Sequence, residues 1–512
     1  MLQKIKLILS LVLFAAIWSN CQEPGQFQAP IGYEPVYVPI PRGPAVQVGT
    51  FVIPEGLNLS GGEVTMNVIA ASPLEKIRLV VKTGANESMT IAEDSLVLGK
   101  IHLRLRGDLP AGTTRIGLYL EAAGDHDLRD RPDIQPESFT LGQQSFSVSH
   151  ARKVPAYRMA TALRTFGDDG VAAYRIPGLV TTPRGTLLAV YDIRRNSSRD
   201  LQGDIDVGLS RSTDGGITWE PMRVIMDMGE WGGRPQDENG IGDPAVLVDP
   251  ETGHIWVAAL WGHGKPGQMV WGSSQPGVAP TETGQFMVVT SEDDGLTWSS
   301  PRSLTPGLKN PEWFLFFNGP GKGITLQDGT LVFPAQFKDK EQMPHSTLIY
   351  SKDKGLTWSV GTGAKSNTTE AQVVALEDGS LMLNMRDNRG GSRSVAVTSD
   401  FGQTWKEHPT SRTALPEPVC MASLIDNPYR PSMLLFSNPA TDKGRYNITI
   451  KASLDDGNTW PTNLQLLLDE GKGWGYSCLT MINEHEVGIL YEGSIANLVF
   501  QIIPLKDLIG PQ

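Results

Sequence analysis

The sequence predicts an all-β protein, in which a small N-terminal β-sandwich precedes a six-bladed β-propeller. Three observations support this prediction. A turn motif recurs five times, apolar strands pair up six times in the second part of the chain, and helical periodicity is scarce. The motif returns at intervals of roughly 45 to 80 residues, and internal repetition of this kind is typical of propellers and repeat arrays.

The recurrent motif reads Ser/Thr-x-Asp-x-Gly-x-Thr-Trp. Its copies are Ser212–Trp219, Ser291–Trp298, Ser351–Trp358, Thr398–Trp405 and Ser453–Trp460. In a tight turn the Asp carboxylate accepts backbone N–H bonds, the Gly allows positive φ, and Thr-Trp begins a strand. A calcium loop is the alternative, but no copy has the alternating ligands and closing Glu of a twelve-residue Ca²⁺ loop. We therefore expect these Asp-turns to be structural.

Length and charge define the class of protein. The chain has 512 residues, 40% of them hydrophobic, and a net charge of −12. These values are typical of a soluble globular protein with more than one domain. No basic stripe is present, which argues against nucleic acid as a partner.

The first residues predict export. Lys4 and Lys6 precede the apolar run Leu7–Trp18, which is too short and too one-sided for a transmembrane span. We therefore predict a signal peptide over residues 1–20 and a location in the periplasm, on the cell surface or outside the cell.

Cys21 is a candidate for a lipid anchor, although Trp18-Ser19-Asn20 matches the small-residue cleavage box poorly, so lipidation stays open. The remaining cysteines, Cys420 and Cys478, form no disulfide framework, and we expect buried thiols. The protein is expected to be a monomer.

Residues 21–45 are rich in Pro, Gly and Gln and predict a linker. Residues 46–150 contain short apolar alternations separated by turn residues, which predicts an antiparallel β-sandwich. The predicted strands are 49–53, 63–69, 76–81, 100–105, 114–120 and 144–148. No catalytic spacing occurs there, so a structural accessory module and a carbohydrate-binding module both remain open.

Residues 151–512 predict the propeller. Six pairs of apolar strands occur, whose first strands begin near Tyr174, Gly242, Gly321, Glu370, Cys420 and Tyr476. Five pairs are followed by a third strand that runs into an Asp-turn, which makes units of four strands. The sixth unit lacks its outer strand, and we predict that Tyr157–Arg164 supplies it and closes the ring.

Strand direction decides which face is functional. In an antiparallel blade, the start of strand one, the end of strand two and the start of strand three share one face, and the Asp-turns lie on the other. The functional candidates on the first face are Arg175, Asp192, Arg194, Arg195, Asp200, Asp243, Glu370, Arg386, Arg445 and Tyr476.

Three of these arginines come from different blades, and we expect them to converge towards the central axis: Arg175, Arg386 and Arg445. The guanidinium fork suits a carboxylate or phosphate, and three of them suit one anion in a fixed orientation. Any one of these arginines alone is more typical of a surface or interblade salt bridge, and it is their shared position in the blades that favours an anion site.

Tyr174-Arg-Ile-Pro177, the five Asp-turns and this set of Arg, Glu and Tyr residues together resemble the sialidase (neuraminidase) family over residues 155–505. The resemblance implies that Arg175, Arg386 and Arg445 grip the substrate carboxylate. It further implies an acid/base catalyst at Asp200, among the nearby carboxylates Asp192, Asp204 and Asp206, and a nucleophile pair at Glu370 and Tyr476. Arg195 and Asp243 are implied as pocket residues.

The implied activity is that of an exported exo-sialidase, which removes terminal sialic acid from glycoconjugates without a metal or cofactor. A carboxylate nucleophile would be repelled by the substrate's own carboxylate, whereas a neutral phenol is not. Glu370 would take the proton of Tyr476, whose free pKa is about 10. Asp200 would act as acid and then base, which requires a pKa above the free value of about 3.9.

Two other functions stay open: a trans-sialidase, including an intramolecular one, and a non-catalytic sialic-acid-binding propeller. Gly319–Gly323 lacks P-loop spacing, and no His-Glu-x-x-His, Cys-x-x-Cys or Gly-x-Ser-x-Gly motif occurs. Trp261, Trp271 and Trp313 are candidates either for the pocket rim or for blade packing.

Overall fold

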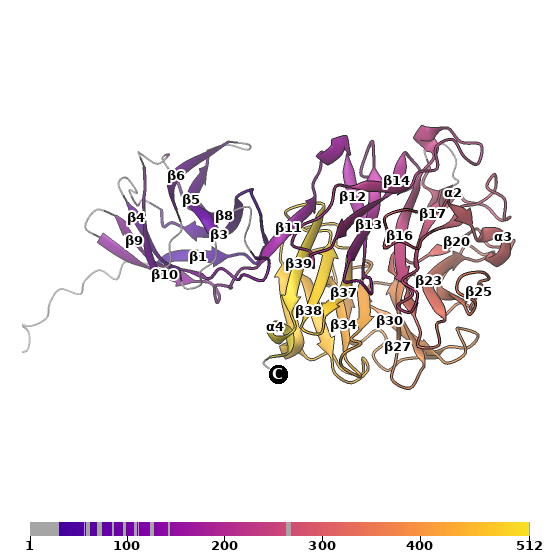
Figure 1. Ribbon diagram of the computed structural model, residues 1–512. Coiled ribbons are helices and arrows are strands. Elements are labelled where there is room, and N and C mark those ends of the chain that lie inside the picture. Colours follow the sequence, from indigo (N-terminus) through magenta and orange to yellow (C-terminus); the bar gives the residue numbers. More distant parts are fainter. Residues whose placement is uncertain are drawn as a thin grey trace, which may run out of the picture.

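The structure, a computed structural model, describes residues 30–510 except 56, 58–61, 69–73, 84–86, 96–98, 107–109, 111, 123–126, 142–143 and 263–267. It is an all-β protein in which an N-terminal domain lies beside a propeller, and β11 (Met159–Arg164) leads from one to the other (Figure 1). The predicted signal peptide and Cys21 lie outside the described residues. Among the residues described, no helix is long and apolar enough to cross a membrane.

The N-terminal domain is one curled nine-stranded sheet in the order β6-β5-β8-β3-β1-β10-β9-β4-β7. Its layers pack on a shared core, in which the rings of Phe51 and Phe139 lie 5.9 Å apart. The strands are β1 (Ile31–Pro35), β3 (Val46–Val52), β4 (Glu63–Val68), β5 (Leu74–Lys82), β6 (Ser88–Ser95), β7 (Gly99–Arg104), β8 (Arg115–Ala122), β9 (Ile134–Leu141) and β10 (Gln144–His150).

The predicted linker over residues 21–45 is wrong where the structure describes it. β1 pairs with β3 antiparallel and with β10 parallel, and Ile31 and Tyr33 are buried in the core. β2 (Ile40–Pro41) pairs with β11 of the propeller. The Pro-rich composition hid these short strands, because long-range pairing stabilises them rather than their own propensity.

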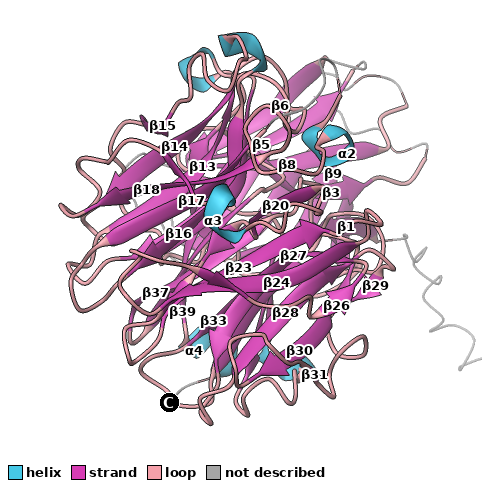
Figure 2. Cartoon of the chain, turned by 90° about the vertical axis from the view of Figure 1, so that its right-hand side faces the viewer, coloured by secondary structure: helices cyan, strands magenta, loops and turns pink. Residues whose placement is uncertain are grey.

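The propeller has six blades, and strands make up nearly all of its regular secondary structure, with loops and turns between them (Figure 2). From the inside outwards, the first blade consists of β12 (Ala173–Thr181), β13 (Leu187–Arg194), β14 (Ile205–Ser212) and β15 (Arg223–Met226), and the second of β16 (Ile241–Val248), β17 (Ile255–Trp261), β18 (Gln285–Ser291) and β19 (Arg302–Ser303). The third consists of β20 (Leu315–Asn318) with β22 (Ile324–Thr325), β23 (Leu331–Lys338), β24 (Pro344–Ser351), and β25 (Ser359–Val360) with β26 (Lys365–Ser366), and the fourth of β27 (Thr368–Ala375), β28 (Leu381–Asp387), β30 (Ser394–Thr398) and β31 (Lys406–Glu407). The fifth consists of β33 (Ser423–Asp426), β34 (Leu434–Pro439), β35 (Ile448–Ser453) and β36 (Gln465–Asp469), and the sixth of β37 (Ser477–Asn483), β38 (Glu486–Tyr491), β39 (Leu498–Pro504) and β11.

A few short elements lie outside this pattern. β21 (Gly321–Lys322) pairs with β16 of the second blade, and β29 (Gly391–Ser392) pairs with β32 (Pro416–Glu417). The short helices are α2 (Val270–Ser273), α3 (Thr305–Leu308) and α4 (Lys506–Ile509), with the 3₁₀ turns η1 (Asp168–Gly170), η2 (Gln236–Glu238) and η3 (Thr462–Leu464).

The ring closes as predicted, because β11 pairs antiparallel with β39 and becomes the outer strand of the sixth blade. The first strand of the propeller therefore completes the last blade. This pairing joins the two ends of the propeller chain.

The Asp-turns satisfy their own polar groups. In the first copy, Asp214 accepts hydrogen bonds from Ser212 Oγ at 2.8 Å and from Thr218 N at 2.9 Å, and Trp219 Nε1 donates to Gly216 O at 3.1 Å. Within β13 and β14, Leu187 pairs with Ser212 at one end and Arg194 with Ile205 at the other. The turns therefore lie at the strand ends opposite to the functional candidates, as predicted.

Candidate active site

A cavity of about 400 Å³ opens at the end of the propeller opposite to the Asp-turns. Its polar side chains come from several blades, and five of its apolar side chains belong to one packed cluster: Leu201, Leu260, Val270, Leu315 and Phe317. The lining residues are Ile176, Asp200, Leu201, Asp243, Leu260, Met269, Val270, Trp271, Leu315, Phe317, Gln336, Thr369, Glu370, Arg386, Asn388 and Tyr476.

Irregularities at the tips of the innermost strands aim side chains into this cavity. The register shifts between Arg175 and Gly178 in β12, between Gly242 and Ala245 in β16, and between Thr368 and Ala371 in β27. Such bulges re-aim side chains and are common beside active sites. They present Arg175, Asp243 and Glu370.

Backbone strain accompanies these tips. Ile176 has φ of 61°, Asp243 has φ of 56°, and Val419, at the equivalent tip of the fifth blade, has φ of 55°. Positive φ is costly for β-branched residues, and strain of this kind clusters at functional sites. Gly475, with φ of 87°, supplies the same conformation before Tyr476 without strain.

Tyr476, Glu370 and Arg386 form a hydrogen-bonded triangle. The hydroxyl of Tyr476 donates to Glu370 Oε1, while Arg386 Nη1 donates to Glu370 Oε2 at 2.6 Å and to the Tyr476 hydroxyl at 2.9 Å. Burial raises the pKa of Tyr476 well above its ordinary value, and the charge of Glu370 adds to this effect. The phenol therefore needs a base to become nucleophilic, and Glu370, which accepts the hydrogen bond of its hydroxyl, is placed to be that base.

Arg175 and Arg445 complete the cluster of arginines around Tyr476. Each guanidinium carbon lies 5.6 Å from the centre of the Tyr476 ring. Arg445 donates to Trp474 O at 2.9 Å and to Val419 O at 3.1 Å. The structure thus brings together the three arginines that the sequence predicted to converge.

Glu492, which the sequence analysis did not select, fixes this cluster from behind. Its Oε1 accepts from Arg175 Nε at 2.5 Å and from Ile176 N at 2.9 Å, and its Oε2 accepts from Tyr476 N at 3.0 Å. The carboxylate is fully buried, and a buried charge requires such partners. Its place at the end of the second strand of the sixth blade, directly after β38, was the available signal.

Asp200 is held by Arg194, whose Nη1 donates to Asp200 Oδ1 at 2.7 Å, while Arg175 Nη1 lies 3.9 Å away. Burial acts to raise the pKa of Asp200, but Arg194, Arg175 and Arg445 outweigh it, so the pKa lies below its ordinary value. The expected upward shift is therefore wrong for the unliganded protein. The side chain is 66% exposed and faces solvent beside the arginines.

Arg195 does not line the cavity, contrary to expectation. It pairs with Asp206 through Nε at 2.9 Å and Nη2 at 2.5 Å. Its neighbour Arg194 points the other way, with a side chain only 1% exposed. Side chains alternate along a strand, so extending the second strand to Arg194 would have put it on the face of Asp192.

Asp243, which lines the cavity, and the buried Asp192 form a second acidic group. Asp192 is buried, bonds Arg194 Nε at 3.1 Å, and accepts from the backbone N–H of Asp243 at 2.8 Å. Burial raises the pKa of Asp192 to about 6. Burial and the charges of Asp192 and Glu370 raise the pKa of Asp243 well above its ordinary value, which favours the protonated form of that carboxyl.

Of the three predicted rim tryptophans, only Trp271 lines the cavity. Lys338 Nζ donates to Trp271 O at 2.9 Å and lies 5.2 Å from its ring centre. Trp261 is fully buried and donates to Asn239, and Trp313 stacks on Phe337 at 4.0 Å. Trp261 and Trp313 therefore pack within the blades, which is the second of the two roles predicted for them.

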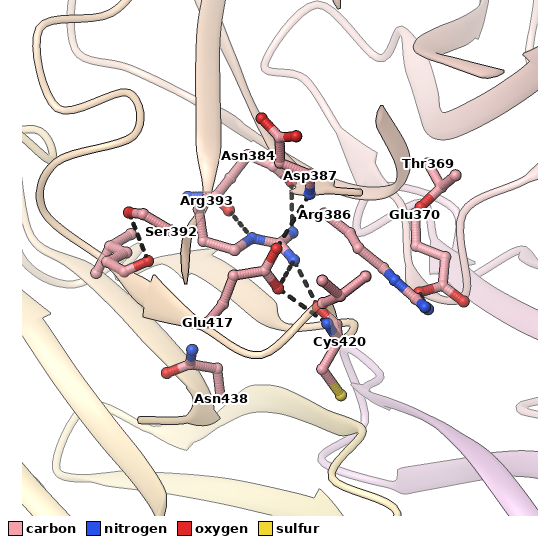
Figure 3. A network of polar contacts seen from close by, with 12 residues as sticks. Thr369, Glu370, Asn384, Arg386, Asp387, Ser392, Arg393, Glu417, Cys420 and Asn438 are labelled. Carbon is pink, nitrogen blue, oxygen red and sulfur yellow. Dashed lines mark hydrogen bonds and ion pairs between the residues drawn. The ribbon is translucent and has the colours of Figure 1, made fainter. Parts of the chain in front are cut away.

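A network of polar contacts lies beside Arg386, with Arg393 and Glu417 at its centre (Figure 3). Glu417 and Arg393 form a fully buried ion pair at 3.2 Å. The Glu417 carboxylate also accepts from Asp387 N at 3.0 Å and from Cys420 N at 3.0 Å. It therefore ties the segment that carries Arg386 to the segment on which Arg445 rests.

The described residues contain no group of three or more His, Cys, Asp or Glu side chains placed to hold a metal ion. Cys420 and Cys478 are buried free thiols, as expected.

The fold and the cavity define a class: a six-bladed propeller whose arginines, paired phenol and carboxylate, and separate Asp suit glycosidic chemistry on an anionic sugar. A family profile described as a BNR repeat-like domain matches residues 185–490. The chain is 51% identical to a sialidase of Bacteroides fragilis over 433 residues, which cover 83% of this chain and 80% of that one. It is 34% identical to a sialidase of Micromonospora viridifaciens over 71% of this chain and 59% of that one.

A solved Hadza microbial sialidase superimposes with a TM-score of 0.88 at 42% identity, over 93% of this chain and all of that one. The chain belongs to the sialidase family. An intramolecular trans-sialidase of Ruminococcus gnavus, at 20% identity and a TM-score of 0.56, shares the fold.

Proposed function

We propose that the protein is an exo-α-sialidase that hydrolyses terminal sialic acid from glycoconjugates or oligosaccharides with retention of configuration. The observation that carries the proposal is the triangle of Tyr476, Glu370 and Arg386, in which a buried phenol donates a hydrogen bond to a carboxylate. Acyl, phosphoryl and metal-assisted chemistries do not require this arrangement. Sialidases use a Tyr nucleophile instead of the usual second carboxylate.

In the proposed mechanism, Arg175, Arg386 and Arg445 bind the substrate carboxylate. Glu370 takes the proton of Tyr476 as the phenol oxygen attacks the anomeric carbon, forming a glycosyl–tyrosine intermediate. Arg386 stays close to both groups, so its charge stabilises the developing phenolate. Water then attacks the intermediate, and Tyr476 recovers its proton from Glu370.

Asp200 is the proposed acid and base for the leaving oxygen and for the incoming water. In the unliganded protein the arginines hold its pKa low. A bound substrate carboxylate neutralises part of that positive charge, and the sugar excludes water. Both effects raise the pKa of Asp200, so substrate binding itself promotes the protonated form that the first step requires.

Proton NMR of the full chain acting on a sialyl-lactose tests this proposal. First release of the α-anomer of free sialic acid supports a retaining hydrolase. A 2,7-anhydro sugar would establish an intramolecular trans-sialidase, and transfer to an added acceptor would establish an intermolecular one. If no linkage gives a product and the protein still binds sialic acid, the protein is a non-catalytic sialic-acid-binding propeller. Tyr476→Phe is the control for adventitious turnover.

Export is a proposal of its own, based on the charged and apolar segments before Cys21. Fractionation of the native host together with radiolabelled palmitate tests it. Label that is lost in Cys21→Ala supports a lipoprotein. Unlabelled protein in the periplasm or medium supports a cleaved signal peptide, and cytoplasmic protein contradicts export. We further propose a monomer, which light scattering tests.

A further inference from the structure

Glu470 joins the N-terminal domain to the propeller at the start of the chain segment that leads to Tyr476. Its carboxylate accepts hydrogen bonds from both terminal nitrogens of Arg152 and, at 2.7 Å, from the backbone N–H of Tyr37. The Glu470 N–H in turn donates to Tyr37 O at 2.7 Å. Arg152 also donates to Pro35 O at 2.6 Å, so the junction is anchored within the N-terminal domain.

The segment Glu470–Gly475, here called the 470–475 loop, carries this junction to the arginines of the cavity. Gly473 N donates to Arg445 O at 3.1 Å, and Arg445 Nη1 donates to Trp474 O at 2.9 Å. The Trp474 ring lies over Arg175, with 4.3 Å between the guanidinium carbon and the ring centre. The next residue after the loop is Tyr476 itself.

The 470–475 loop has little room to move independently of its surroundings. A Cβ atom added at Gly471 would lie 2.2 Å from Ser494 Cβ, and one at Gly473 would lie 2.5 Å from Glu492 O. Close packing of this kind transmits small displacements instead of absorbing them. We therefore expect a shift at Glu470 to be passed on to the other end of the loop.

We propose that the N-terminal domain positions the catalytic arginines and Tyr476 through the contact of Arg152 and Tyr37 with Glu470, so that the domain contributes to turnover of even the smallest sialosides. This inference rests on the proposed function of the same cavity. It differs from the role of an accessory carbohydrate-binding module, which would improve action only on large or multivalent substrates. Arg152 is a positioning residue, since it touches neither the cavity nor Tyr476.

The test compares two full-length variants that each remove one ion pair between the domains. Arg152→Ala removes the pair with Glu470. Arg129→Ala removes the pair with Glu486, in which Arg129 Nη2 donates to Glu486 Oε2 at 2.9 Å. Glu486 is the first residue of β38, and Glu492 beside the cavity follows the last residue of that strand. The control variant Arg129→Ala therefore removes a contact at the end of β38 that lies away from the cavity. Both variants weaken domain docking, but only the first touches the 470–475 loop.

With a small fluorogenic sialoside, we expect Arg152→Ala to lower kcat/KM by about tenfold to a hundredfold, because misplacement of catalytic groups by about 1 Å costs this much. Arg129→Ala is expected to stay within about twofold of wild type, with a similar change in Tm. Arg152→Lys should restore part of the loss. In a double-mutant cycle, Arg152→Ala with Glu470→Ala should cost no more than the larger single loss.

Equal kinetics of the two variants would overturn the inference, as would additive losses in the cycle. If Arg152→Ala does not fold, Arg152→Gln takes its place in the same comparison. Affinity for the sialic-acid analogue DANA, measured by calorimetry, is a readout that needs no turnover. A wild type that binds DANA but hydrolyses nothing contradicts the proposed function, whereas weaker DANA binding in Arg152→Ala alone still supports the positioning role.

Discussion

The hydroxyl of Tyr476 donates a hydrogen bond to Glu370, although the two residues are 106 positions apart and belong to the sixth and fourth blades. Removing that hydroxyl tests the nucleophile. We expect Tyr476→Phe to abolish most turnover while the affinity for sialic acid stays near wild type, because the three arginines are untouched. Kinetics and calorimetry on the same preparation measure both quantities. Wild-type turnover would contradict the assignment.

Glu370→Gln keeps the shape of the side chain but removes the base. General base catalysis contributes about 10²- to 10⁴-fold, so kcat should fall by that factor. The loss should not be additive with that of Tyr476→Phe, because the two groups act in one step. Steady-state rates of the single and double variants measure this, and independent losses would argue against the pair.

Arg386→Ala is expected to weaken binding as well as rate. A hydrogen bond to a charged group is worth about 1.5–3 kcal/mol, so KM and DANA affinity should worsen by roughly tenfold to a hundredfold. Arg389→Ala is the matched control, since Arg389 pairs with Asp387 and is 39% exposed. If Arg386→Ala lowers the rate but leaves KM and DANA affinity unchanged, Arg386 does not bind the substrate carboxylate.

Arg194 sets the protonation of Asp200, and this predicts a pH effect. Its positive charge lowers the pKa of Asp200, so Arg194→Gln should raise that pKa. A general acid must be protonated, and the alkaline limb of kcat/KM reports it in the free enzyme. That limb should therefore move to higher pH in Arg194→Gln. Arg195→Gln, which loses only the pair with Asp206, should leave the alkaline limb unchanged. A shift of that limb in Arg195→Gln but not in Arg194→Gln would show that Arg195, and not Arg194, is the arginine of the pocket.

The Asp-turns predict how stability depends on pH. Hydrogen bonds from Thr297 and Ser291 lower the pKa of Asp293 from 3.8 to about 2. A lowered pKa stabilises the fold above the unfolded-state value, and this contribution is lost as the pH falls through the folded-state value. Asp293→Asn should therefore lower Tm at neutral pH and flatten its decline between about pH 4 and pH 2. Calorimetry measures Tm, and an unchanged slope would contradict the role.

The sequence by itself determined the propeller, the five turns, the closing strand and the face of the propeller that Tyr476, Glu370 and Arg386 share. The physical reason is that an antiparallel blade leaves no freedom about which strand ends share a face, so the order of strands already selects these residues. The same logic extends to Arg194, since alternation along β13 places it with Asp192.

Only the tertiary structure decided the rest. Positive φ at Ile176 and Val419 contradicts local propensity and persists because surrounding packing imposes it. The pKa of Asp200 depends on arginines from three different strands or loops, which no local pattern reveals. Glu492, Glu417 and Glu470 act through buried or interdomain partners far away in the chain, and β1 exists only because β3 and β10 pair with it. Such features depend on distances in space, whereas the sequence records only spacing along the chain.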